Sequence, residues 1–189
     1  MWRVRSIRTP RSEVSAVDWL AALFRWVHFL AGVMWIGLLY YFNFVSAPAS
    51  AQATAAGEAG PISKYITPLA LVYFRWAAVV TWLVGAALLG TNPYGPGPNG
   101  LNGFVSAFAF QGQYALIGFG AWLGTIMLFN VWVLIWPNQK DIFGFVAATD
   151  PEKAKARRVA FLASRTNTML SIPMLFFMGS NHFVRIFTG

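Results

Sequence analysis

The sequence of 189 residues contains no cysteine, and only 11% of its residues are charged. Without cysteine, the chain can form no disulfide, ligate no iron–sulfur cluster through thiolates and attach no c-type haem. The six carboxylates all lie in the N-terminal tail, in loops or at the edge of an apolar run: Glu13, Asp18, Glu58, Asp141, Asp150 and Glu152. A proton pump or a carboxylate-coupled transporter normally keeps a carboxylate inside the membrane, so both classes are disfavoured. The sequence also lacks the paired carboxylates or the Ser/His/Asp set that hydrolytic enzymes use.

Long apolar runs dominate what the sequence does contain. Hydrophobic residues make up 57% of the chain, which is typical of a polytopic membrane protein. A helix needs about 20 apolar residues to cross a bilayer core. Four segments are long enough: Trp19–Val45, Ile66–Leu89, Tyr114–Trp136 and Phe161–Phe187.

The shorter apolar run Gly103–Phe110 is predicted to form an interfacial helix before the third span; the alternative is that it starts a fifth span. The predicted fold class is therefore all-α, a polytopic membrane four-helix bundle with one short interfacial helix. Residues 18–189 are predicted to form a single transmembrane domain, and residues 1–17 a basic N-terminal tail.

The net charge of +8 comes largely from two basic clusters that flank apolar runs. Their members are Arg3, Arg5, Arg8 and Arg11 in the tail, and Lys153, Lys155, Arg157 and Arg158 before the last span. Clusters beside membrane spans set topology or contact anionic lipid, so membrane lipid rather than nucleic acid is the expected partner. The positive-inside rule favours external termini, because more of the loop cations then lie inside.

The only two histidines lie inside predicted spans, and their neighbours mirror each other. Residues three or four apart share one face of a helix. The same three residue types therefore share a face in both spans: Arg25, His28 and Gly32 in the first, and Gly179, His182 and Arg185 in the last. Histidine and arginine are costly in hydrocarbon, which makes these two faces candidates for a site.

Four spans would place both termini on one side of the membrane and both histidines in one leaflet. We therefore predict that His28 and His182 ligate the iron of one b-type haem, with Arg25 and Arg185 as propionate partners. Gly32 and Gly179 would give the macrocycle its clearance. Ligation by two imidazoles leaves no open iron position, so such a site transfers electrons. A fifth span would separate the histidines, and the alternative is that each one forms a hydrogen bond within the bundle.

Further small and polar residues inside the apolar runs indicate where helices pack together. Thr81, Thr125 and Asn130 are expected to form hydrogen bonds between helices. The spacing Gly120-x-x-x-Gly124 is typical of helices that approach closely.

Four runs in the apolar segments resemble the membrane domain of bacterial membrane-bound urate oxidases. They are FRWVHFLAGVMWIGLLYYFNFV (24–45), FRWAAVVTWLVG (74–85), LGTIMLFNVWVLIWPNQK (123–140) and ASRTNTMLSIPMLFFM (163–178). In the longer members of that family a cytochrome c domain follows the membrane domain, so the resemblance implies redox chemistry coupled to a c-type haem. This sequence has no Cys-x-x-Cys-His motif. The resemblance thus implies a membrane module that works beside a separate c-type cytochrome or within a larger complex.

Three functions are consistent with these observations. The first is a subunit of the bacterial inner membrane that binds b-type haem and transfers electrons, next to a c-type cytochrome or inside a respiratory or photosynthetic complex. The second is a cofactor-free accessory subunit of a larger membrane complex, in which the histidines are structural. The third is a urate-oxidase-like membrane oxidoreductase.

Overall fold

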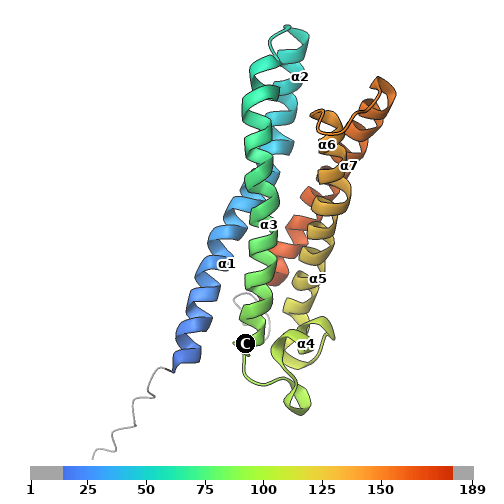
Figure 1. The fold of residues 1–189 in the computed structure, drawn as a ribbon. Helices are drawn as coiled ribbons and strands as arrows, with labels where there is room; N and C mark the ends of the chain where they lie inside the picture. Colours follow the sequence, from blue (N-terminus) through green and yellow to red (C-terminus); the bar gives the residue numbers. More distant parts are fainter. Residues whose placement is uncertain (1–14, 181–189) are drawn as a thin grey trace, which may run out of the picture.

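The computed structural model describes residues 15–180, which fold into four long helical rods and one short helix (Figure 1). The first rod joins α1 (Ala16–Tyr40) through a π-helical turn (Tyr41–Ser46) to α2 (Ala47–Ala55). The second rod begins with a π-helical turn (Ile62–Ile66) and continues as α3 (Thr67–Gly90). Within the described residues the fold contains helices and no strand.

The second half of the chain supplies the other two rods and the short helix α4 (Gly103–Phe108). The third rod contains α5 (Ala115–Phe129), a π-helical turn (Asn130–Ile135) and α6 (Trp136–Ile142). The fourth rod is α7 (Asp150–Met178). We predicted a short helix before the third long one, and α4 confirms it. Residues 101–136 contain this short helix, a 3-10 turn (Gly112–Tyr114) and part of one long rod, so they do not form the two spans of the alternative prediction.

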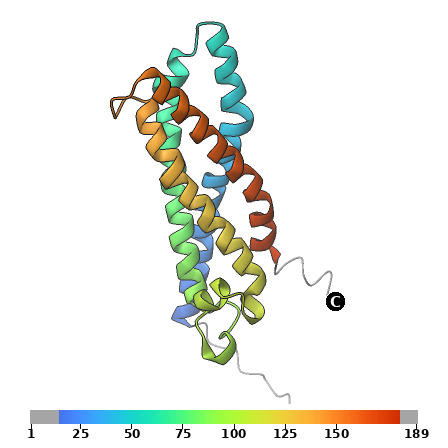
Figure 2. The ribbon, with the colours of Figure 1, turned by 90° about the vertical axis from the view of Figure 1, so that its right-hand side faces the viewer.

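The rods run antiparallel and pack in two pairs (Figure 2). The rod of α1 packs along α3, and α7 packs along α5 and α6. One end of the bundle, here called the α4 end, holds the beginning of α1, the end of α3 and α4 (Figure 1). The opposite end, called the α2 end, holds α2, α6 and the beginning of α7.

Three helices are long and apolar enough to cross a membrane: Ala16–Ala55, Ile62–Gly90 and Gly112–Ile142. They contain the first three predicted spans. The fourth rod, α7, is not among them over its described residues, because basic and amide side chains such as Arg157, Arg165 and Asn167 interrupt its apolar sequence. The structure thus supports a helical membrane protein, whereas the predicted count of four spans is not confirmed.

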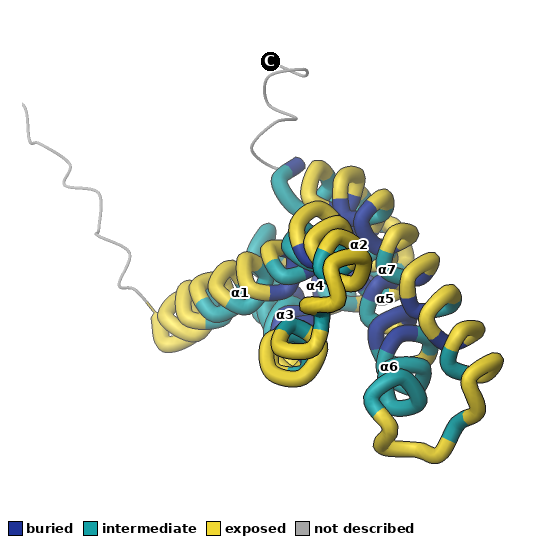
Figure 3. The backbone as a smooth tube through the Cα atoms, turned by 90° about the horizontal axis from the view of Figure 1, so that it is seen from above, coloured by how far each residue is buried: buried dark blue, intermediate teal, exposed yellow. Residues whose placement is uncertain are grey.

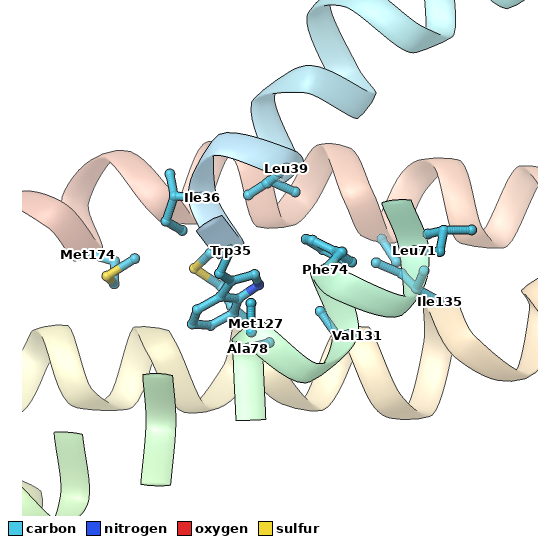
Figure 4. Packing of buried hydrophobic residues seen from close by; sticks show 12 residues of the cluster. Trp35, Ile36, Leu39, Leu71, Phe74, Ala78, Met127, Val131, Ile135 and Met174 are labelled. Atoms are coloured by element: carbon cyan, nitrogen blue, oxygen red, sulfur yellow. The ribbon is translucent and has the colours of Figure 1, made fainter. Parts of the chain in front are cut away.

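The core lies where α1, α3, α7 and the rod of α5 and α6 meet (Figure 4). Leu39 and Met127 are fully buried there, and Phe74 and Val131 are nearly so. Large apolar side chains such as Val33 of α1, which is 71% exposed, cover the outside of the rods. Seen from above, exposed residues line the outer faces and buried residues the inner ones (Figure 3). Such an exposed apolar surface is expected where the surroundings are lipid.

A hydrogen-bonded cap begins α7 outside the predicted spans. The backbone N–H and the hydroxyl of Thr149 both donate to the Glu152 carboxylate, each at 2.7 Å. The backbone bond first, and the hydroxyl second, hold the pKa of Glu152 below its ordinary value. The charged carboxylate therefore stabilises the first turn at neutral pH, and this contribution is lost as the pH falls through the lowered pKa.

We expect Glu152→Gln to speed amide hydrogen exchange in the first turn of α7 at neutral pH, because the amide accepts these bonds more weakly than the carboxylate. The difference between the variant and the original protein should vanish once the pH lies below the lowered pKa. Hydrogen–deuterium exchange with mass spectrometry, run at several pH values, measures this difference. A gap that persists unchanged into acid would contradict the role of the charge.

Candidate functional site

His28 lies on the face of α1 that packs against α3. Its Nδ1 is 2.8 Å from the main-chain carbonyl oxygen of Thr81. A carbonyl oxygen can only accept, so Nδ1 carries the proton and donates this bond. In the neutral ring, Nε2 is then left with a lone pair. Among residues 15–180, Nε2 has no hydrogen-bond partner.

Gly85, one turn after Thr81 in α3, makes room for the His28 ring. A Cβ atom on Gly85 would lie 2.7 Å from Cε1 and 2.9 Å from Nδ1 of His28, closer than side chains approach one another. The imidazole edge thus rests directly on the α3 backbone. Gly32, the position predicted to clear the haem macrocycle, lies near Thr81, where a Cβ would meet Cγ2 at an ordinary 3.8 Å.

The other predicted site residues lie outside the contact of His28 with Thr81 and Gly85, or outside the described residues. Arg25 is exposed on α1, one turn closer to the α4 end than His28. Gly179 is the C-cap of α7, and its N–H donates to the Leu175 carbonyl. His182 and Arg185 lie outside the described residues, so the pairing of His28 with His182 stays a prediction.

A buried amide pair joins the third and fourth rods. Asn130 Nδ2 donates to Asn167 Oδ1 at 2.8 Å, and Asn167 Nδ2 donates to the Met127 carbonyl at 3.0 Å. Asn167 is fully buried. The predicted bond between helices at Asn130 is confirmed. Asn167 was not singled out from the sequence, although an amide side chain inside an apolar run was a signal that could have found it.

Of the other predicted contacts between helices, those at Thr125, Thr81 and Gly120 are present and the one at Gly124 is not. Thr125 accepts a hydrogen bond from Trp82 Nε1 at 2.8 Å, as expected of a contact between helices. The Thr81 hydroxyl instead donates to the Ala77 carbonyl of its own helix, so the contact predicted for it is made by its carbonyl oxygen. A Cβ on Gly120 would come within 3.2 Å of Met178, which confirms close approach there, whereas Gly124 faces open space.

Arg75 of α3 is a further cation, inside a helix that is long and apolar enough to cross a membrane, and it was not singled out from the sequence. Its guanidinium carbon lies 3.6 Å from the ring centroid of Trp136 and 5.7 and 5.9 Å from those of Trp132 and Trp76. Contacts with aromatic faces stabilise a cation where water is scarce. An arginine inside an apolar run was itself a sufficient signal.

Comparison with known proteins finds a family similar to slightly less than half of this chain. Residues 100–189 match the family model described as urate oxidase N-terminal. No curated protein and no solved structure matches the chain. The matched residues include α4, α5, α6 and α7, whereas His28, Thr81 and Gly85 lie before them. The second half of this chain is accordingly similar to the urate oxidase N-terminal domain.

Proposed function

We propose that this chain is an integral subunit of the bacterial inner membrane that holds a b-type haem through His28 and transfers electrons beside a c-type cytochrome. The observation that carries the proposal is the hydrogen bond from His28 Nδ1 to the Thr81 carbonyl. Histidines that ligate a metal almost always donate their other N–H to a carbonyl, a carboxylate or water. This bond fixes the tautomer whose Nε2 can bind iron.

The residues around His28 fit such a ligand. The ring is held from one side by the carbonyl and rests on the α3 backbone at Gly85, so its orientation is set before any group binds. The haem, when bound, would supply one-electron chemistry. The proposed second ligand is His182, and the proposed propionate partners are Arg25 and Arg185. Gly32 and Gly179 would remain the positions that clear the macrocycle.

The absorption spectrum of the purified full chain tests this proposal. We expect a Soret band that disappears in His28→Gln and in His182→Gln. Glutamine can still donate a hydrogen bond to the Thr81 carbonyl, but it does not replace imidazole as a haem ligand. The helices should therefore keep their circular dichroism while the haem is lost. No Soret band in protein from haem-sufficient cells, or a band unchanged in both variants, would overturn the proposal.

A cofactor-free accessory subunit is the second candidate, and the same bond favours it. The contact of His28 with Thr81 joins α1 to α3 across one of the two packed pairs, which is what a structural histidine does. Under this candidate the purified chain shows no Soret band, and His28→Ala loses stability where His28→Gln keeps it.

A urate-oxidase-like oxidoreductase is the third candidate, and the family match of residues 100–189 favours it. Membranes containing the chain would then reduce added cytochrome c when urate is supplied. No urate-dependent reduction by intact membranes would exclude this candidate.

A further inference from the structure

A cavity lies at the α2 end of the bundle, in the other half of the first rod from His28. It has a volume of about 450 Å³, within the size range of small-molecule sites. Its lining comes from the rod of α1 and α2, the start of α3, α6 and α7. The residues of the haem proposal are not part of it.

The inner part of the cavity is apolar and aromatic. Leu71, Phe74 and Ile135 are buried core residues that line it. Phe42 completes this floor and meets Phe74 edge to face, with ring centroids 5.6 Å apart. A flat hydrocarbon body, aromatic or otherwise, would find van der Waals contacts here.

Neutral hydrogen-bonding groups also line the cavity. Asn43 Nδ2 donates to the Leu39 carbonyl and to Ser164 Oγ, so the amide is held in one orientation and Oδ1 is left as an acceptor. Ser46, Ser63 and Gln139 add further polar side chains to the lining. A mainly apolar lining with a few polar groups is typical of a ligand site.

One charged side chain lines the cavity. It is Arg157, which is exposed on α7, and the described lining contains no carboxylate. A smaller hollow nearby differs in this respect, because Asp141 and Glu152 line it together with Lys155. A guanidinium in a described lining that contains no carboxylate favours an anionic ligand.

We propose that this cavity binds an amphipathic organic anion. Its apolar body lies on the floor of Phe42 and Phe74, its anionic group meets Arg157, and its other heteroatoms meet the amide and hydroxyl groups. The anion can come from solution or from the headgroup region of an anionic lipid. The inference is independent of the haem proposal, since the two sites share no residue.

Equilibrium dialysis of the full chain in nanodiscs tests the site, with empty nanodiscs as the blank. The probe is 2-naphthoate, and 2-naphthylmethanol is its uncharged counterpart. In nanodiscs of phosphatidylcholine we expect Arg157→Gln to weaken naphthoate binding about tenfold, the size expected for one charge-assisted hydrogen bond. Arg157→Lys should retain most of the binding. Binding of the alcohol should be the same in all three proteins.

Arg158→Gln is the matched control, because Arg158 is an exposed neighbour that does not line the cavity. It should bind naphthoate as the original protein does. A second set of nanodiscs contains added phosphatidylglycerol and separates the two sources. Loss of naphthoate binding there identifies an anionic lipid as the occupant, and unchanged binding identifies a soluble anion. Absence of naphthoate binding in phosphatidylcholine, or equal binding by Arg157→Gln, overturns the proposal.

Discussion

A Gly85→Val protein should lose about 2–3 kcal/mol of stability, the cost of forcing extra atoms into a packed interface. The first atom of the new side chain would already lie 2.7 Å from His28 Cε1. Either the imidazole moves away from α3 and loses its hydrogen bond to the Thr81 carbonyl, or α1 and α3 separate. The free energy of unfolding in mixed detergent micelles measures the loss, and the Soret band of any bound haem should fall with it.

Gly37→Val is the matched control for this substitution. Gly37 is a helical glycine of α1 that is exposed, and a Cβ there would have no neighbour within 4 Å. We expect its stability to change by less than about 0.5 kcal/mol. A double variant, Gly85→Ala with His28→Ala, should be less destabilised than the two single changes added together, because the clash disappears with the ring. Strict additivity would show that the two residues do not share a contact.

An Asn167→Ala protein should also be destabilised, by about 2–3 kcal/mol in the same assay, from two lost interhelical hydrogen bonds and a small void. Asn167 is the fully buried residue that bonds both Asn130 and the Met127 carbonyl. Its removal leaves the amide nitrogen of Asn130 without that partner inside the bundle. A buried donor without a partner costs more than the bond itself contributes.

Thr166→Ala controls for this change, because Thr166 precedes Asn167 in α7 but is exposed. It should be close to neutral. In a double-mutant cycle, Asn130→Ala and Asn167→Ala should show a coupling energy of about 1 kcal/mol, within the range measured for such pairs in membrane proteins. Zero coupling would mean that the amide contact contributes nothing to the packing of α7 on α5.

The elements that could be predicted from the sequence are those that depend on local composition. The first three long helices follow from the length of their apolar runs, and α4 follows from its short one. The fourth run, Phe161–Phe187, extends beyond the described residues, and Arg165 and Asn167 interrupt its described part, so α7 is not among the helices that are apolar enough to cross a membrane. Length and polarity are properties of a single segment, so this part of the fold can be predicted without knowing how the segments pack together.

The contact of the His28 ring with α3 could not be predicted in the same way. Its two partners are a main-chain carbonyl and the space above a glycine. Neither carries a side-chain signal, and both lie on another helix whose register against α1 is set by packing. The polar side chain at Thr81 was an obvious candidate, yet its hydroxyl stays within its own helix while its backbone makes the contact.

The length of the first rod has a consequence for where partners can approach. Its 40 residues extend about 60 Å, twice the roughly 30 Å of a hydrocarbon core. Part of the rod must therefore stand outside the bilayer core. His28 and the end of α2 at Ala55 are separated by about 40 Å along the helix axis. A cytochrome that exchanges electrons with a haem at His28 would have to dock at the α4 end, because electron transfer slows steeply with distance. The α2 end would be left free for the anion. Electrons would then enter at the α4 end of the bundle, and the ligand at the α2 end.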